Sequence, residues 1–297
     1  MPDRVIELLV SDGDAGPYGI TTGADGALWI TLVHAGAIAR LGADHAISTV
    51  SLDSPECGPT MISAGPDGAL WFTRSHDHRI GRLTTDGRAT TYELPTPEAG
   101  PYGICVGPDD ALWFTEMNVD RIGRITVDGQ VSEFTLPVSG GYPSAITAGP
   151  DGALWFTLNQ ANAVGRIDLD GDTRMHQLPT AGAAPVGITA DGEAVWFVEI
   201  GAGQLGRISP EGEISELPLP DRTARPHAIV ADGAGGCWFT EWGANRIGHL
   251  DGDRMITEYD LPTAGSEPHG LTIGPDGAVW VALESGAVAT IGCSQPR

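Results

Sequence analysis

The residues best suited to chemistry lie near the C-terminal end of the chain, in the phrase Glu267-Pro268-His269-Gly270 and at Glu284. Two neighbouring carboxylates can bind a divalent cation through hard oxygen atoms, or they can share a proton. A histidine titrates near neutral pH and can accept a proton from a substrate. The same Pro-His pair occurs earlier as Pro226-His227. These residue types predict an acid–base site, provided that the fold brings them together.

A repeated phrase shows how the fold can do so. The phrase reads roughly Gly-x-Asp-Gly-x-Leu-Trp-Phe-Thr, and its tryptophans are Trp29, Trp71, Trp113, Trp155, Trp196, Trp238 and Trp280. A period of about 42 residues with Gly and Asp turns is typical of β-propellers, in which each repeat is a four-stranded blade. We therefore expect an all-β, seven-bladed propeller of antiparallel blades, forming a single domain over residues 1–297.

The repeat between Pro101 and Pro137 predicts strands over residues 102–106, 111–116, 121–126 and 131–136, joined by tight turns. The last repeat ends near Ile291 without a fourth strand. The segment Arg4–Val10 resembles such a strand and has no blade of its own. We expect it to complete blade seven and close the ring, which removes two exposed sheet edges.

The first strand of each propeller blade lines the central channel, so its opening residues should meet at one mouth. In blade seven, a regular hairpin with Ile273 opposite Ala278 would place His269 opposite Ala282. The same pairing would place Glu267 opposite Glu284. Like charges directly opposite each other in a sheet are destabilising. A shared Mg²⁺ or a shared proton would remove the repulsion, and the alternative is that Glu284 points into solvent.

Equivalent positions in other blades supply candidate substrate contacts. Trp242 occupies the Glu284 position in blade six and is a natural platform for an apolar ligand. The other expected contacts are the aromatic residues Tyr18 and Tyr102 and the polar residues Thr60, Ser144 and Asn159. For His76 and His78, in a loop on the same rim, we expect solvent exposure.

The composition restricts the partners. The net charge is −23 and the chain has no lysine, which argues against nucleic acid or an anionic membrane as a partner. The first residues lack the features of a secretory signal, and no apolar run reaches membrane-spanning length. Cys57, Cys105, Cys237 and Cys293 are too widely spaced to indicate a zinc site or a disulfide framework. We expect a cytoplasmic monomer with reduced thiols.

The phrases Arg225-Pro226-His227 and Glu267-Pro268-His269-Gly270, with Glu284 and the seven repeats, resemble the streptogramin B lyases (virginiamycin B lyase). The resemblance spans the whole chain. It implies an enzyme that opens cyclic depsipeptide antibiotics by elimination at the threonine ester, which confers resistance. It also implies that His269 accepts the proton, Glu267 and Glu284 hold Mg²⁺, and His227 binds the substrate.

Two other functions fit the same fold. A metal-dependent propeller lactonase would hydrolyse its substrate and so add one water to the product, whereas elimination leaves the mass unchanged. An interaction scaffold, a common use of propellers, would leave the opposed glutamates unexplained and would be insensitive to a chelator.

Overall fold

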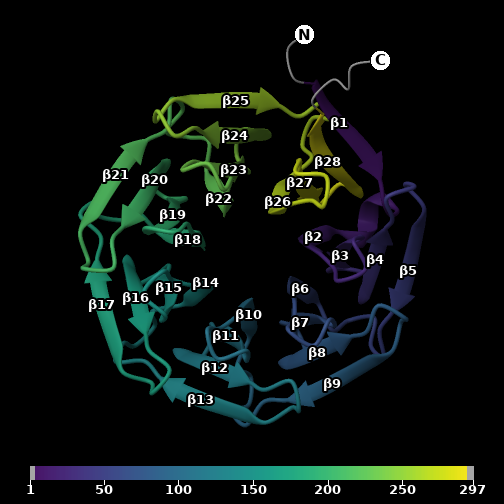
Figure 1. The fold of residues 1–297 in the computed structure, drawn as a ribbon, viewed down its shortest axis with the longest axis horizontal. Helices are drawn as coiled ribbons and strands as arrows, with labels where there is room; N and C mark the ends of the chain where they lie inside the picture. The colour runs from purple at the N-terminus through teal and green to yellow at the C-terminus, as the bar shows by residue number, and fades with distance from the viewer. Residues whose placement is uncertain (1–3, 293–297) are drawn as a thin grey trace.

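The computed structural model describes residues 4–292 and arranges them as seven four-stranded antiparallel sheets around a central axis (Figure 1). In six of the sheets the strands follow chain order from the axis outward. The seventh has the order β1-β28-β27-β26, so it joins the two ends of the described chain. The predicted all-β, seven-bladed propeller is confirmed.

Each blade contributes one strand to each of four concentric layers. The innermost strands are β2 (Pro17–Thr22), β6 (Pro59–Ala64), β10 (Pro101–Val106), β14 (Pro143–Ala148), β18 (Pro185–Ala190), β22 (Pro226–Ala231) and β26 (Pro268–Ile273). The second layer is β3 (Leu28–Leu32), β7 (Leu70–Arg74), β11 (Leu112–Glu116), β15 (Leu154–Leu158), β19 (Val195–Glu199), β23 (Cys237–Glu241) and β27 (Val279–Leu283). The third is β4 (Ala37–Leu41), β8 (Arg79–Leu83), β12 (Arg121–Ile125), β16 (Ala163–Ile167), β20 (Gln204–Ile208), β24 (Arg246–Leu250) and β28 (Ala287–Gly292). The outermost is β5 (Ile47–Ser51), β9 (Ala89–Glu93), β13 (Val131–Thr135), β17 (Thr173–Gln177), β21 (Ile214–Pro218), β25 (Ile256–Asp260) and β1 (Arg4–Leu9), and one 3-10 turn, η1 (Gly13–Ala15), follows β1.

The N-terminal strand closes the ring as expected. Strand β1 pairs antiparallel with β28, from Arg4 opposite Gly292 to Leu9 opposite Ala287. Its end differs by one residue from the predicted segment, which ran to Val10. Because β1 is the outer strand of blade seven, the blade that carries Glu267, His269 and Glu284 is assembled from both ends of the described chain.

Six of the seven repeat tryptophans are buried between blades and donate a hydrogen bond to the aspartate of a turn, whereas Trp238 is partly buried. In blade two, Trp71 is fully buried, and its Nε1 donates a 3.1 Å hydrogen bond to Asp67. The other oxygen of Asp67 accepts 2.7 Å from Nε of Arg82, and that guanidinium lies over the indole ring. Blades one, three and four repeat both hydrogen bonds, and in blades one and three the guanidinium also lies over the indole ring. The repeated Asp, Trp and Arg therefore lock the turn to the second and third strands.

The threonine of the repeat joins neighbouring blades at the channel. Thr73 Oγ1 donates 2.7 Å to the carbonyl of Tyr102 in the next blade, and Thr240 Oγ1 donates 3.1 Å to the carbonyl of His269. Equivalent bonds reach the carbonyls of Thr60, Ser144 and Val186. In these five blades the backbone of the residue at the channel mouth is therefore fixed by the preceding blade.

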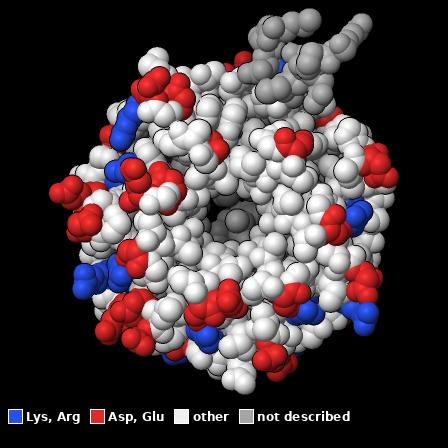
Figure 2. All heavy atoms as spheres, in the orientation of Figure 1, with Lys and Arg blue, Asp and Glu red and all other residues white. Residues whose placement is uncertain are grey.

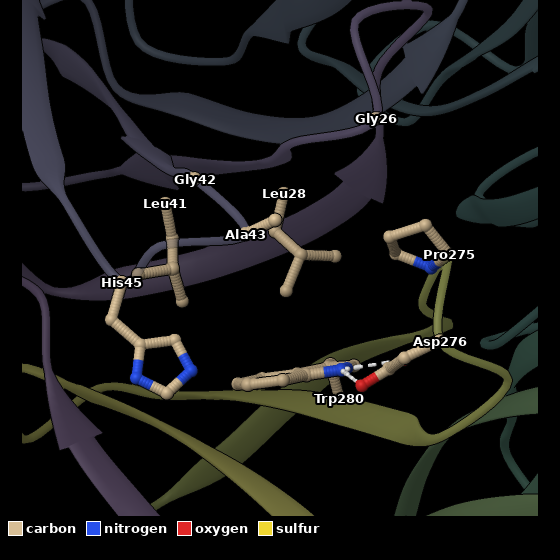
Figure 3. Close-up of a pocket in the computed structure, with 9 residues that line it drawn as sticks. All are labelled: Gly26, Leu28, Leu41, Gly42, Ala43, His45, Pro275, Asp276 and Trp280. Atoms are coloured by element: carbon tan, nitrogen blue, oxygen red, sulfur yellow. Dashed lines mark hydrogen bonds between the residues drawn. The ribbon is translucent and has the colours of Figure 1, made fainter.

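A small cavity lies at the seam between blades seven and one. It has a volume of about 120 Å³, and Leu28, Leu41 and Trp280 form its apolar wall (Figure 3). Asp276, which binds the indole nitrogen of Trp280, belongs to the turn after β26. The cavity is thus at the end of the hairpin remote from Glu267 and Glu284.

Acidic side chains are spread over the face of the ring that surrounds the central opening (Figure 2). Among the described residues, no helix has the length and apolar character needed to cross a membrane. Cys57, Cys105 and Cys237 are free thiols, and Cys293 lies outside the described residues.

The last residue of the second strand is buried in all seven blades, yet four of these residues are charged. Arg74 is ion-paired with Asp53 and Asp77, and Glu199 and Glu241 accept hydrogen bonds from Gln204 and Arg246. Glu116 is fully buried, and neither of its carboxylate oxygens accepts a hydrogen bond within residues 4–292. Burial raises the pKa of Glu116 to about 8.

We predict that Glu116→Gln stabilises the protein more as the pH rises. Between the ordinary glutamate pKa of about 4.3 and the raised value, the unfolded chain loses its proton while the folded protein keeps it, so rising pH favours unfolding. A glutamine, which does not ionise, removes this pH-dependent loss of stability. The melting temperature of the variant relative to the parent should increase by about 2 °C or more between pH 5 and pH 8. The control is Glu93→Gln, a substitution at an exposed glutamate. If the difference in melting temperature between Glu116→Gln and the parent stayed constant from pH 5 to pH 8, Glu116 would ionise normally.

Candidate active site

Glu267 and Glu284 are held opposite each other by the innermost hairpin of blade seven. The backbone N–H of Glu284 donates 3.2 Å to the carbonyl of Glu267, just beyond the pair Pro268–Leu283. The predicted register of the hairpin was wrong at its other end. Ile273 pairs with Val279, not with Ala278 as expected.

A β-bulge explains why the glutamates still face each other. The register of β26 and β27 shifts between Pro268 and Leu271, so regular pairing of His269 with Ala282 is not maintained. The same shift occurs at the start of the inner strand in all seven blades. Bulges re-aim side chains and are frequent beside active sites. Here the bulge sits at the residue that opens each inner strand at the channel mouth.

The backbone at Glu267 is left-handed, with φ of 51°. The equivalent residues Gly16, Gly58 and Gly100 have the same sign of φ, and glycine adopts this conformation without steric cost. A side chain in this region costs of order 1 kcal/mol, and such residues concentrate at functional sites. The carboxylate of Glu267 therefore occupies a position at which the backbone favours glycine.

Glu284 binds a histidine at each carboxylate oxygen. Its Oε2 lies 2.5 Å from Nε2 of His269, and its Oε1 lies 2.8 Å from Nε2 of His34 in blade one. These hydrogen bonds, above all the one to His269, lower the pKa of Glu284 to about 2. The alternative that Glu284 points into solvent is wrong. Its repulsion with Glu267 is relieved by contacts with two histidines, which the hairpin pattern alone does not predict.

His34 was not identified from the sequence. The available signal was its place one residue after Val33, the blade-one counterpart of Glu284, in the blade next to blade seven. Gly16 makes room for the ring, since a Cβ on Gly16 would lie 2.5 Å from it. His76 lies over Gly58 in the same way in blade two, but no carboxylate bonds with its ring among the described residues.

His269 lies in a group of four aromatic rings at the mouth. The ring stacks on Tyr18 with centroids 4.2 Å apart and meets His227 edge-on at 4.9 Å. Tyr18 in turn hydrogen-bonds Tyr102 through their hydroxyls at 2.7 Å. The structure therefore brings together four of the predicted site residues from blades one, three, six and seven.

Burial keeps His227, Tyr18 and Tyr102 uncharged. Burial and the nearby His269 lower the pKa of His227 to about 3, so His227 is a neutral imidazole at neutral pH. Burial raises the pKa of Tyr102 to about 12, and burial together with the neighbouring Tyr102 raises the pKa of Tyr18. Both phenols keep their protons and can donate hydrogen bonds. Nδ1 of His269 and Nδ1 of His227 are buried without a partner among the described residues.

The three polar residues predicted as substrate contacts have hydrogen-bond partners outside the four-ring group. The Thr60 hydroxyl bonds Ser75 and the Gly58 carbonyl, and the Ser144 hydroxyl donates to the carbonyl of Tyr142. Asn159 donates to the carbonyl of Pro185, at 3.4 Å. None of the three has a hydrogen bond to the four-ring group within the described residues.

Trp242 and His78 also have local partners. The indole of Trp242 is half-buried beneath the guanidinium of Arg225, which lies 5.7 Å from the ring centroid. His76 is exposed, as expected. The expectation for His78 was wrong, because it is partly buried and its Nδ1 accepts a 3.3 Å hydrogen bond from the N–H of Gly100.

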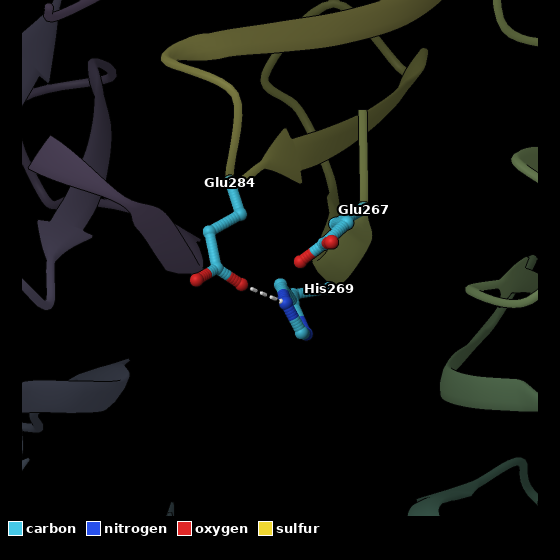
Figure 4. A group of neighbouring side chains, drawn as sticks. All are labelled: Glu267, His269 and Glu284. Atoms are coloured by element: carbon cyan, nitrogen blue, oxygen red, sulfur yellow. Dashed lines mark hydrogen bonds and ion pairs between the residues drawn. The ribbon is translucent and has the colours of Figure 1, made fainter. Parts of the chain in front are cut away.

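The donor set at the mouth fits a small divalent cation. One ligand atom each from Glu267, His269 and Glu284 lies within 4.8 Å of the others, and this is the one such group among the described residues. Figure 4 shows the two carboxylates and the imidazole directed into the same space. Two carboxylates that leave room for water suit Mg²⁺.

The fold and the site define a seven-bladed propeller in which a histidine and two carboxylates converge at one mouth of the channel. Residues 3–291 match the Virginiamycin B lyase family, and the chain belongs to that family. It is similar to a solved streptogramin B lyase, with 45% identity and a TM-score of 0.94 over 98% of this chain and 97% of the other. It is also similar to a catalytically inactive histidine-to-alanine variant of virginiamycin B lyase from Staphylococcus aureus with quinupristin. That match has 42% identity and a TM-score of 0.94 over 98% of this chain and 99% of the other.

Curated relatives match over shorter stretches. Virginiamycin B lyase from Streptomyces coelicolor is 58% identical over 48 residues, 16% of each chain. The relative from Saccharopolyspora erythraea is 58% identical over 55 residues, 18% of each chain. A gluconolactonase-like structure with 14% identity and a TM-score of 0.65 shares the propeller fold alone.

We predict that His34→Ala weakens metal binding. Groups that orient a metal ligand typically contribute 10–100-fold to metal affinity or activity. The dissociation constant for Mn²⁺, which favours the same oxygen ligands as Mg²⁺, should rise by about that factor in calorimetry without substrate. His76→Ala is the matched control. Equal Mn²⁺ affinity in the His34 variant and the parent protein would show that the contact with Glu284 is incidental.

Proposed function

We propose that this protein is a carbon–oxygen lyase that linearises cyclic depsipeptides of the streptogramin B class by Mg²⁺-dependent elimination at their threonine ester bond. The observation that carries the proposal is the convergence of His269, Glu267 and Glu284 at the channel mouth, in a chain of the Virginiamycin B lyase family. A solved relative with quinupristin supports a substrate of this class. The same proposal includes a role in antibiotic resistance and a cytoplasmic monomer.

The elimination needs a base, and His269 is positioned to be that base. The Cα–H bond of the threonine breaks, its proton goes to His269, and the electron pair forms the Cα=Cβ double bond. That double bond forms as the Cβ–O bond breaks, and the electrons of the Cβ–O bond remain on the departing carboxylate. Atoms and charge balance without added water, and the product has the mass of the substrate.

The accepting nitrogen of His269 follows from its contacts. With Glu284 ionised, Nε2 donates to Oε2 and the lone pair resides on Nδ1, which is buried. Nε2 becomes the accessible acceptor when the Glu284 carboxylate turns away from it and the imidazole carries its proton on Nδ1 instead. The contact with His34 gives Glu284 a partner on its other side during this change.

Glu267 and Glu284 would hold the Mg²⁺, and the cation would act as a Lewis acid for negative charge that develops next to the carbonyl. His227, neutral and edge-on to His269, would bind the substrate, with Tyr18 and Tyr102 as the aromatic wall beside it. Trp242, Thr60, Ser144 and Asn159 are proposed as more distant contacts around the mouth.

The proposal is tested by incubating the purified protein with quinupristin, with and without a chelator, and measuring the product mass. We expect a linear product of unchanged mass that forms only when Mg²⁺ is present. A product heavier by one water would indicate hydrolysis and a lactonase. No product in either sample would favour an interaction scaffold.

We predict that His269→Ala lowers kcat by about 10²–10⁴-fold, the usual contribution of a positioned base. His227→Ala should retain measurable turnover, because its proposed role is binding. Steady-state kinetics at saturating Mg²⁺ separate the two variants. Near-normal kcat in His269→Ala with an inactive His227→Ala would mean that the two roles are reversed.

A further inference from the structure

We propose that Arg225 and Trp242 form a subsite that binds the carboxylate released when the ester bond breaks. The inference deepens the proposed lyase function and rests on it for the identity of the ligand. No step described so far uses Arg225, although it belongs to the same ring of positions as the proposed metal ligands.

The pair is the blade-six counterpart of the two glutamates. The N–H of Trp242 donates 3.1 Å to the carbonyl of Arg225, as the N–H of Glu284 does to that of Glu267 at 3.2 Å. Arg225 also has the same left-handed φ, 51°, as Glu267. Two neighbouring blades thus place a long charged side chain, one acidic and one basic, at a position where three other blades have glycine.

The guanidinium of Arg225 has no acidic partner within residues 4–292. Ten arginines form ion pairs with carboxylates, namely Arg40, Arg74, Arg79, Arg82, Arg88, Arg121, Arg124, Arg166, Arg207 and Arg246. Arg225 instead lies over the face of Trp242. An unpaired cation in a chain of net charge −23 is suited to an anionic ligand.

The space beside this pair reaches Glu267, one of the two proposed metal ligands. A cavity of about 460 Å³ is lined by Thr223, Arg225, Trp242, Gly243, Ala244, Asn245, Gly265 and Glu267. Gly243 makes room for the arginine, because a Cβ there would lie 3.1 Å from Cβ and Cγ of Arg225. The indole Nε1 of Trp242 is buried without a hydrogen-bond partner among the described residues.

This combination matches the chemistry of the departing group. Elimination moves one negative charge onto a carboxylate that was part of a neutral ester. A guanidinium can donate two parallel hydrogen bonds to a carboxylate, and the indole offers an apolar surface to the group attached to it. Because the charge develops as the bond breaks, Arg225 would favour the ring-opened form over the intact ring.

The test compares two ligands with metal-free protein, in which no turnover is expected. One is intact quinupristin, and the other is quinupristin opened by mild alkaline hydrolysis of its ester, which carries the free carboxylate. Calorimetry should show that Arg225→Ala raises the dissociation constant of the opened form about 10-fold or more, the scale of a hydrogen bond to a charged group. The dissociation constant of the intact form should change much less.

Arg254→Ala is the matched control, since Arg254 lies over Trp196 at 5.6 Å, in a cavity that includes no candidate site residue. Equal affinity of Arg225→Ala and the parent protein for the opened form would overturn the subsite. If the parent protein binds the opened form through Arg225 but never converts quinupristin, the subsite stands and the lyase function fails.

Discussion

The pairing of the two glutamates is the constraint on which the site depends. A backbone hydrogen bond holds Glu267 and Glu284 on adjacent strands, and their side chains converge with that of His269. Like charges so placed destabilise a sheet unless something compensates. Two histidines from different blades provide part of the compensation, and a bound cation would provide the rest. The repulsion between opposed carboxylates occurs in one blade of seven. Because the fold does not require it in the other blades, it indicates a functional role.

The propeller makes such a site possible because its repeats fix the backbone around the mouth. The threonine of five repeats hydrogen-bonds the next inner strand, and the one in blade six holds the carbonyl of His269 itself. The bulge in every inner strand sits at the mouth residue. Function can therefore change by substitution at a few ring positions, while the Asp, Trp and Thr of the repeat preserve the scaffold.

The sequence predicts most of the fold because the repeat carries its own turn and packing signals. The number of blades, the strand bounds to within a residue and the closure by the first strand all follow from it. The bulge does not, because regular pairing counted from the turn gives no sign of the extra residue. The opposed glutamates were nevertheless placed correctly, since the wrong starting pair and the bulge offset each other.

Contacts between blades were the least predictable part of the site. His34 reaches Glu284 from blade one, across the seam that the ring closure creates, and nothing in the sequence near residue 284 points to it. Arg225 precedes a Pro-His pair in the sequence, but its place over Trp242, within blade six, depends on side-chain packing. His34 follows the blade-one counterpart of Glu284, so comparing equivalent positions in blades seven and one is the signal for that contact.

The central claim is that the opposed carboxylates bind a divalent cation. The most direct measurement is anomalous diffraction from a crystal grown with Mn²⁺ and ring-opened quinupristin. We predict one strong peak at about 2.0–2.3 Å from an oxygen of Glu267 and an oxygen of Glu284. A crystal with the ligand bound at the mouth and no peak between these carboxylates would contradict the account.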